Sequence, residues 1–344
     1  MDLELNEEQQ ALRDSVRRFL EKRSSESEVR RLMATDRGYD EDTWHAMAAE
    51  LGLQGLPITG QHGGSGAGWR EVAVVMEEMG RSLACVPYLS TMLAAAALSE
   101  SSATDADLSA IAAGDLIATV VFDGNLTVSD GRVNGSARFV LDGHVADLFV
   151  IAVRDSLHVV HSGDGVTAAL RPTLDQTRKL ADVTFADAAV TTIGSSDVVE
   201  HVRTLATVLL AAEQVGGAQR VMEMAADYAR SRTQFGRPIG MFQGVKHKCA
   251  DMLLAVESAR AAAYYAAWVA AQQREDLSKA AHVAGAYCSD AYFRVAALNI
   301  QVHGGIGFTW EHPAHLYYRR AKSGQILFGT PAEHRAALAD LLEV

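Results

Sequence analysis

The chain has few cysteines, and none of them forms a close pair. Its three cysteines, Cys85, Cys249 and Cys288, are scattered over 344 residues without a CxxC spacing. A disulfide framework needs an even set of recurring cysteines, and a structural zinc site needs paired thiolates, so the sequence favours neither. Unpaired thiols persist in a reducing compartment, and we therefore expect a cytoplasmic protein.

The chain also lacks an excess of positive charge and long apolar runs. It carries 31 Lys and Arg against 43 Asp and Glu, a net charge of −12. Nucleic acids and anionic membranes are not attracted to an acidic surface, so neither is expected as a partner. Apolar runs such as Met92–Leu98 fall far short of the roughly 20 residues that span a bilayer. The acidic, amphipathic start of the chain predicts no signal peptide.

The hydrophobic pattern changes twice along the chain, which is long enough for two or three packed regions. Residues 1–113 show helical spacing of apolar residues, and the first helix starts at an Asn6-x-x-Gln9 capping-box pattern. Residues 114–195 are short runs rich in Val, Ile, Phe and Thr between turn signals. The helical period returns in residues 196–344. We therefore predict an α+β, mostly α fold, with an N-terminal helical domain, a small β-barrel or sandwich domain and a C-terminal four-helix bundle.

Three histidines close in the sequence could suggest a metal site. They are His303, His312 and His315, and the last two flank a predicted helix entrance. No acidic residue stands at a ligand spacing from them. We therefore predict that the chain holds no metal.

The stretch Asp227–Lys246 reads DYARSRTQFGRPIGMFQGVK and joins two long helical patterns. Arg232 closes the first pattern, the breaker Gly236–Gly240 follows, and Gln243 opens the second. A cation and a neutral amide held about a rigid turn, beside the ring of Phe235, suit a dinucleotide with a charged pyrophosphate and a flat ring. An ordinary turn capped by an arginine has the same spacing, so both interpretations remain open at this point.

Three local strings, in this order, resemble the acyl-CoA dehydrogenase family of flavoproteins over essentially the whole chain. The strings are Pro57–Gly66 with Glu77-Glu78-Met79-Gly80-Arg81, then Arg232-Thr233-Gln234-Phe235-Gly236-x-Pro238 through Phe242-Gln243, and then Gln301-Val302-His303-Gly304-Gly305-x-Gly307-Phe308. The resemblance implies FAD-dependent α,β-dehydrogenation of an acyl-CoA thioester, with an electron-transfer flavoprotein or another acceptor. It also implies that one subunit holds most of the ADP half of each FAD, while the flavin ring lies against the β domain of its neighbour.

The resemblance also implies which residues hold FAD. In such enzymes the arginine of the RxxFG string binds the pyrophosphate, the phenylalanine and glutamine contact the nucleotide, and the QxxGG segment lines the adenosine half. A charge-assisted bond from the arginine would contribute about 1.5–3 kcal/mol, and glycines let the backbone approach phosphates. The residues so assigned to FAD are Arg232, Phe235, Phe242, Gln243, Gln301, Gly304, Gly305 and Thr330.

The flavin-facing side departs from the family pattern. Members usually carry a TEPxxGSD-like loop at the entry to the β domain, whereas Ala118–Asn125 reads ATVVFDGN. A second flavin-contacting string, aromatic-Ile-Thr/Ser-Asn-Gly, is represented only by Phe139–Gly143, which reads FVLDG. The hydroxyl donors that the family aligns at those positions are missing. The resemblance therefore does not extend to the flavin-facing side.

The catalytic base is the second departure. Removal of an α-proton from the thioester needs a carboxylate, worth about 10²–10⁴ in rate as a general base. Members supply it from an EGT string, which here reads Phe328-Gly329-Thr330, or from the helix before the RxxFG string, where the matching residue is Ala206. Neither Phe328 nor Ala206 can accept a proton. Glu213, about two turns and roughly 10 Å beyond Ala206 on the same helix, remains as a candidate base, and a structural carboxylate is the alternative.

The residues after the FGT string suggest a helix start. Pro331 suits the first position of a helix. Glu333 would then place negative charge in the first turn, where the helix dipole favours it.

The leading hypothesis is a subunit that lacks its own base and donates the ADP half-site to the FAD of a catalytically complete paralogue. The resemblance includes such heterotetrameric dehydrogenases, known for bulky acyl-CoA substrates such as steroid side chains in actinobacteria. A second hypothesis is an autonomous homotetramer with Glu213 as a relocated base. A third is a flavin-free scaffold or acyl-CoA-binding protein, although such a protein would have no physical need of the FAD strings.

Overall fold

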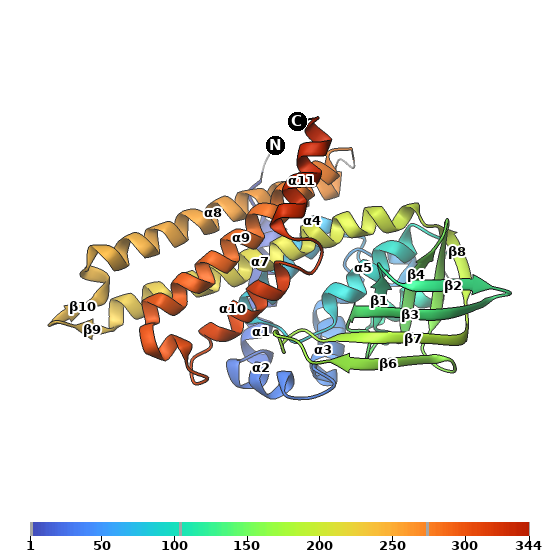
Figure 1. The fold of residues 1–344 in the computed structure, drawn as a ribbon, viewed down its shortest axis with the longest axis horizontal. Helices are drawn as coiled ribbons and strands as arrows, with labels where there is room; N and C mark the ends of the chain where they lie inside the picture. Colours follow the sequence, from blue (N-terminus) through green and yellow to red (C-terminus); the bar gives the residue numbers. More distant parts are fainter. Residues whose placement is uncertain (1–2, 103–104, 273–274, 344) are drawn as a thin grey trace. The chain divides into compact units, whose positions relative to one another are not determined.

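Helices make up most of the structure, with strands concentrated in the middle of the chain (Figure 1). The structure is a computed structural model that describes residues 3–102, 105–272 and 275–343. The predicted α+β, mostly α class is confirmed. The chain divides into two compact units, which we call the helical unit (Met1–Ser27, Ala73–Ala84 and Thr207–Val344) and the mixed unit (Glu28–Val72 and Cys85–Ala206).

The helical unit is built mainly from long helices. Its α8 and α9 pack side by side, and α10 and α11 pack against α9 (Figure 1). The first helix begins with the predicted capping box, because Asn6 Oδ1 accepts from Gln9 N at 2.8 Å and Gln9 Oε1 accepts from Asn6 N at 3.1 Å. The helices of this unit are α1 (Glu7–Arg23), the end of α4 (Trp69–Ser82), most of α7 (Asp197–Ser231), α8 (Gln243–Gln272), α9 (Leu277–His303), α10 (Ala314–Gly324) and α11 (Pro331–Leu342).

Two glycines let α4 and α7 cross at short range within the helical unit. A Cβ atom at Gly216 would lie 1.7 Å from the carbonyl oxygen of Glu77, and one at Gly80 would lie 1.9 Å from that of Glu213. Any side chain at either glycine would overlap the facing backbone. The crossing therefore requires glycine on both helices.

Ion pairs from the Glu77–Arg81 string tie α4 to three other helices. Tyr264 of α8 also donates to Glu77 at 2.8 Å, and burial together with the Glu77 carboxylate raises the pKa of Tyr264 to about 12. Such a network holds helices in one register when its charges are paired. The pairs are Arg260–Glu77 to α8, Arg17–Glu78 to α1 and Arg81–Glu223 to α7.

The mixed unit combines short helices with two sheets of four strands each. Strand order is β1-β4-β5-β8 in one sheet and β2-β3-β7-β6 in the other. The pair β1–β4 is parallel, and the remaining pairs of these sheets are antiparallel. The elements are α2 (Glu26–Met33), α3 (Glu41–Leu51), α5 (Tyr88–Ser99), α6 (Asp105–Ala113), β1 (Ala118–Val121), β2 (Asn125–Ser129), β3 (Arg132–Leu141), β4 (Leu148–Val153), β5 (Ser156–His161), β6 (Val166–Arg171), β7 (Leu180–Ala189) and β8 (Thr191–Ser195).

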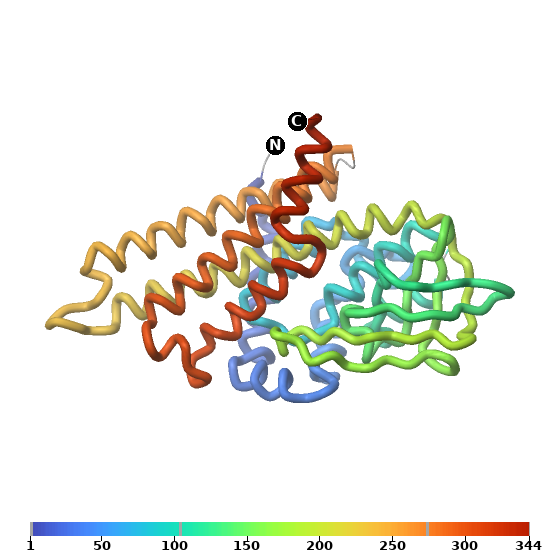
Figure 2. Tube along the Cα trace, in the orientation of Figure 1, coloured from blue at the N-terminus to red at the C-terminus, as the bar shows by residue number. Residues whose placement is uncertain are grey.

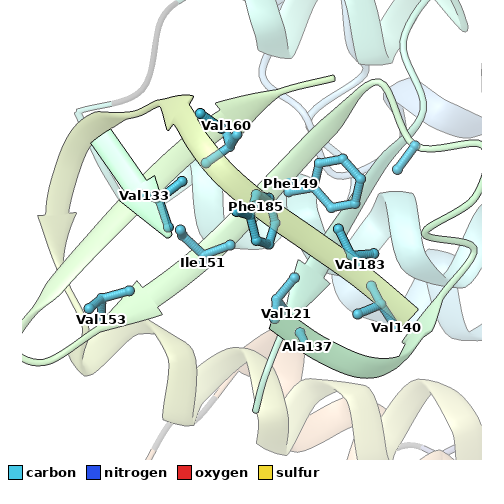
Figure 3. Packing of buried hydrophobic residues seen from close by; sticks show 12 residues of the cluster. Val121, Val133, Ala137, Val140, Phe149, Ile151, Val153, Val160, Val183 and Phe185 are labelled. Carbon is cyan, nitrogen blue, oxygen red and sulfur yellow. The ribbon is translucent and has the colours of Figure 1, made fainter. Parts of the chain in front are cut away.

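One apolar core joins the two sheets, which identifies the β region as a sandwich (Figure 3). Phe149 of β4 and Phe185 of β7 meet edge to face, with ring centroids 5.7 Å apart. Ile151 and Val183 lie in the same cluster and are fully buried. Alternating inward side chains of two sheets produce such a core. The almost wholly buried helix α5 packs on β1 and β4.

Within the described ranges, no helix has both the length and the apolar character needed to cross a bilayer.

Candidate functional site

A short hairpin joins α7 to α8 and carries the RxxFG string (Figure 2). Strands β9 (Thr233–Gln234) and β10 (Arg237–Pro238) pair antiparallel, which leaves Phe235 and Gly236 as a two-residue loop. Both loop residues have positive φ, +52° at Phe235 and +76° at Gly236, as a type I′ turn requires. Positive φ is unusual for a bulky residue, and the side chain of Phe235 is 92% exposed. A strained, exposed aromatic residue marks this loop as a candidate binding element.

The hairpin presents charge and aromatic surface together. Phe235 meets Phe242 edge to face at 6.0 Å, and the Arg237 guanidinium lies 4.4 Å from the centroid of Phe242. The backbone of Arg232 is fixed by two bonds: its N donates to Tyr228 O at 2.8 Å, and its O accepts from Ile239 N at 2.8 Å. The hairpin backbone is thus held in place while its side chains stay exposed.

Three polar side chains predicted to hold FAD are exposed and uncommitted. Among the residues that the structure describes, no hydrogen bond or ion pair occupies the side chains of Arg232, Gln243 or Gln301. A free guanidinium with amide donors can bind phosphate oxygens by charge-assisted hydrogen bonds. These side chains therefore fit the pyrophosphate of a dinucleotide, and their assignment to FAD remains a prediction.

A pair of stacked rings joins the RxxFG and QxxGG ends of the helical unit. Tyr228, one turn before Arg232, stacks on His303 with ring centroids 4.3 Å apart. His303 ends α9, two residues after Gln301, and its Nδ1 lies 2.9 Å from the accepting carbonyl oxygen of Asn299. Burial lowers the pKa of His303 and thereby favours the neutral ring. The hydrogen bond to Asn299 acts in the opposite direction and is the smaller effect. Tyr228 was not among the residues predicted for this site, although an aromatic residue four positions before Arg232 lies on the same helix face.

The glycines of the QxxGG string lie beyond the end of α9 and are exposed. Gly304 ends the helix with φ +64° and ψ −139°, a conformation open to glycine. A Cβ atom at Gly304 or Gly305 would meet nothing within 4 Å. Open space beside bare backbone allows a ligand to approach closely, so both residues fit the predicted contact with a nucleotide.

The histidines near this end form aromatic contacts. His303 and His312 have ring centroids 4.2 Å apart, and His315 meets Trp310 at 4.6 Å. His312 Nδ1 accepts from Ala314 N at 3.2 Å. In the described ranges no group of three or more His, Cys, Asp or Glu is placed to hold a metal ion. These rings therefore act in packing within this structure.

Neither usual base position offers a proton acceptor, and the candidate Glu213 is engaged. Ala206 is fully buried, and Phe328 lies between α10 and α11. Glu213 Oε1 accepts from Arg320 Nη1 at 3.1 Å, and both side chains are only 5% exposed. A carboxylate held by a buried guanidinium is favoured in its charged, bonded form. This geometry favours a structural role for Glu213, and its catalytic role remains an untested prediction.

The residues after Phe328 form a helix start, as the sequence predicts. Thr330 is the N-cap of α11, and Pro331 occupies its first turn. Thr330 Oγ1 accepts from Glu333 N at 3.3 Å and donates to Glu333 Oε2 at 2.8 Å, and Thr330 N donates to the same carboxylate at 2.7 Å. The hydroxyl group and the backbone N of Thr330 are therefore already in use, and among the described residues no hydrogen bond joins Thr330 to Arg232.

In the mixed unit, Phe139 occupies an irregular position on β3. The ladder between β3 and β7 shifts register between Ala137 and Val140, and Phe139 has φ +57°. Its side chain is 53% exposed and lies beside Arg138, whose guanidinium is 4.9 Å from the ring centroid. Phe139 N donates to Asp182 Oδ1 at 3.3 Å. A bulge of this kind re-aims a side chain and takes it out of the ladder.

A large cavity also lies in the mixed unit, and none of the residues predicted to hold FAD is among its lining residues. Its volume is about 1090 Å³, and its walls include Tyr39, His144, Asp147 and Lys179. Lys179 Nζ donates to Met33 O at 2.8 Å, and burial lowers the pKa of its ammonium group. The charged groups of the walls have both signs, so they do not select one class of ligand.

Comparison with known proteins decides the family. The model of the acyl-CoA dehydrogenase C-terminal domain matches residues 199–342, and that of the N-terminal domain matches residues 6–106. The chain belongs to the acyl-CoA dehydrogenase family. Acyl-CoA dehydrogenases are FAD-dependent oxidoreductases, so the predicted enzyme class and cofactor are confirmed.

This acyl-CoA dehydrogenase resembles mycobacterial proteins over nearly its whole length. It is 36% identical over 329 residues to the acyl-CoA dehydrogenase IpdE2 of Mycolicibacterium smegmatis, covering 96% of this chain and 97% of that protein. A chain of the ChsE4–ChsE5 complex from Mycobacterium tuberculosis matches with a TM-score of 0.92 and 29% identity, covering 100% of this chain and 99% of that chain. A chain of the Tcur3481–Tcur3483 steroid acyl-CoA dehydrogenase matches with a TM-score of 0.91 and 25% identity, covering 98% of each.

Proposed function

We propose that this chain is the base-less subunit of a heteromeric acyl-CoA dehydrogenase. It contributes Arg232, Gln243 and Gln301 to the ADP half of an FAD whose flavin ring and catalytic carboxylate belong to a paralogous chain. The observation that carries the proposal is a contrast within the chain. The polar side chains of the ADP half are exposed and make no hydrogen bond or ion pair with the described part of the chain, whereas Phe328 and Ala206 cannot act as bases.

Two solved relatives support a heteromeric assembly. Both the ChsE4–ChsE5 complex and the Tcur3481–Tcur3483 dehydrogenase pair two differently named chains, and one of them is described as a steroid acyl-CoA dehydrogenase. By this likeness the substrate is a bulky acyl-CoA of the steroid side-chain type. The electron acceptor is an electron-transfer flavoprotein or a protein of similar function. None of Cys85, Cys249 and Cys288 forms a disulfide, which fits a reducing cytoplasm.

The decisive experiment counts subunits and flavins together. The chain is purified alone and after coexpression with its nearest paralogue, and the mass and the flavin absorbance are measured on the same sample. We expect a colourless chain alone and a yellow complex with one FAD for each pair of unlike chains. A yellow homotetramer that passes electrons from an acyl-CoA to an acceptor would overturn the proposal.

The same measurements distinguish the proposal from the two other hypotheses. An autonomous dehydrogenase with Glu213 as base predicts a yellow chain whose flavin is bleached by substrate, and bleaching that is lost in Glu213→Gln. A flavin-free scaffold predicts a colourless protein even with its paralogue. The buried Arg320–Glu213 pair disfavours the first of these, because a base must be free to accept a proton.

A further inference from the structure

The hydrogen-bond donors at the start of α11 are occupied by a carboxylate of the same chain, that of Glu333. A threonine hydroxyl has one proton to donate, and Thr330 gives it to Glu333 Oε2 at 2.8 Å. The backbone N of Thr330 donates to the same oxygen at 2.7 Å. The backbone N of Glu333 donates to Thr330 Oγ1 at 3.3 Å. Pro331 has no N–H to offer. Most donors that a helix start usually presents to an anion are therefore used or absent.

The charge at this position has the wrong sign for a phosphate. The Thr330 backbone and hydroxyl donors hold the pKa of Glu333 below its usual value, so the carboxylate stays ionised at neutral pH. An ionised carboxylate in the first turn balances the positive end of the helix dipole, which otherwise attracts anions. A cofactor phosphate arriving here would meet like charge and no free hydroxyl donor from Thr330.

A second carboxylate acts in the same way on the bulge of β3, within the mixed unit. Asp182 Oδ1 accepts from Phe139 N at 3.3 Å, and the other oxygen pairs with Arg171 and with Arg138 at 3.8 Å. The Arg171 guanidinium, followed by smaller effects of its other partners, holds the pKa of Asp182 below its usual value. The carbonyl groups of a flavin ring need donors, and the N–H of Phe139 is already committed within the chain.

We infer that two carboxylates withhold this chain's own donors from FAD, each within its own unit: Glu333 occupies the donors of Thr330 in the helical unit, and Asp182 occupies the N–H of Phe139 in the mixed unit. An FAD whose pyrophosphate is bound by Arg232 then takes its flavin-facing contacts from another chain. The inference rests on the proposed function and adds the residues that prevent this chain from completing a second flavin site. It also removes Thr330 from the set of cofactor ligands.

The test uses the complex of this chain with its paralogue and compares Thr330→Ala with Arg232→Ala. Thr330→Ala removes the cap of α11, so we expect a melting temperature lower by about 2–4 °C and an unchanged FAD content per complex. Thr330→Ser keeps the hydroxyl and restores the melting temperature. Loss of FAD in Thr330→Ala, with FAD retained in Thr330→Ser, would overturn the inference.

Asp182→Ala tests the other carboxylate. Loss of its pairs with Arg171 and Arg138 lowers the melting temperature of the chain, while the FAD content of the complex stays unchanged. One FAD for every chain of the unaltered complex would also overturn the inference. The proposed function fails separately, when Arg232→Ala leaves the FAD content intact, so the two failures are distinguishable.

Discussion

Tyr228 stacks on His303 with ring centroids 4.3 Å apart and ring planes inclined by 27°. The two rings connect the end of α7, from which Arg232 follows, to the end of α9, which carries Gln301. Strings separated by about seventy positions in the sequence therefore belong to one end of the helical unit. The stack links the segment that carries the predicted phosphate-binding arginine to the segment that carries the glutamine on α9.

Replacement of Tyr228 by alanine tests this spacing. An aromatic pair contributes roughly 0.5–1.5 kcal/mol beyond its buried area, so Tyr228→Ala should destabilise the chain by at least that amount in urea unfolding. The FAD content of the complex should fall at the same time. Tyr228→Phe keeps the stack and should preserve both quantities. Full FAD content in Tyr228→Ala would show that the stack does not position the cofactor residues.

Replacement of Arg232 by alanine removes the guanidinium that fits the pyrophosphate. Loss of about 1.5–3 kcal/mol corresponds to FAD binding weaker by roughly 10- to 150-fold. The measurement is FAD retention by the complex during dilution or dialysis. Arg230→Ala is the matched control, because Arg230 is exposed on the same helix end but pairs with Asp227 at 3.0 Å. Equal FAD retention in the two variants would contradict the assignment of Arg232.

Replacement of Glu213 by glutamine tests the buried pair with Arg320. Removal of the Glu213 carboxylate takes a counter-charge from a buried guanidinium, so we expect a loss of roughly 3–5 kcal/mol in unfolding free energy. The double variant Glu213→Gln, Arg320→Met should recover part of that loss. Glu257→Gln is the control, because the Glu257 side chain is 55% exposed and its pair with Arg260 contributes little. Normal stability with lost flavin bleaching would instead support Glu213 as a base.

Two facing histidines predict how stability depends on pH. His282 Nδ1 and His334 Nδ1 are 3.0 Å apart; burial lowers the pKa of both rings, and the neighbouring His282 lowers that of His334 further. When the pH falls below the ordinary histidine pKa of 6.5, the unfolded chain therefore binds more protons than the folded chain. The contribution of the neutral His282–His334 pair to folding stability is complete above that ordinary pKa, and it is lost as the pH falls below it.

Urea unfolding at about pH 7.5 and about pH 5.5 measures this effect across the histidine range. The double variant His282→Gln, His334→Gln should lose less stability between the two conditions than the unaltered chain. His247→Gln, at an exposed position on α8, is the control and should leave the pH dependence unchanged. An identical pH dependence in the double variant and the unaltered chain would contradict the assignment to this pair.

Local signals in the sequence predicted the long helices, most of the strands and one helix cap correctly, whereas the short helices α2 and α6 were not predicted. The Asn6–Gln9 capping box and the start of α11 at Pro331 depend on residues three or four positions apart, so they can be read along the chain. The same spacing relates Thr330 to Glu333, but the family resemblance directed attention to Thr330 as a cofactor ligand. The short strand β8 was missed, because it follows β7 after a single residue and has no turn signal of its own.

Contacts between distant residues were beyond the sequence. Nothing near Glu213 in the chain indicates Arg320, which is 107 positions away, and nothing near Phe139 indicates Asp182, which is 43 positions away. Both carboxylates acquire their partners only when helices or strands from separate segments pack together. Their charge state and availability then depend on that packing, since a buried or paired carboxylate differs from an exposed one.

The amino-acid sequence alone was enough to establish the fold class, the family and the absence of a carboxylate at both usual base positions. Each of these depends on residue identity and on periodicity within a few positions. The folded chain was needed to show that the side chains of Arg232 and Gln301 bond to no residue within the described ranges, while Thr330 and Phe139 are hydrogen-bonded to Glu333 and Asp182. A side chain's free hydrogen-bonding capacity is what remains after its neighbours in space have been satisfied, and those neighbours are set by tertiary packing.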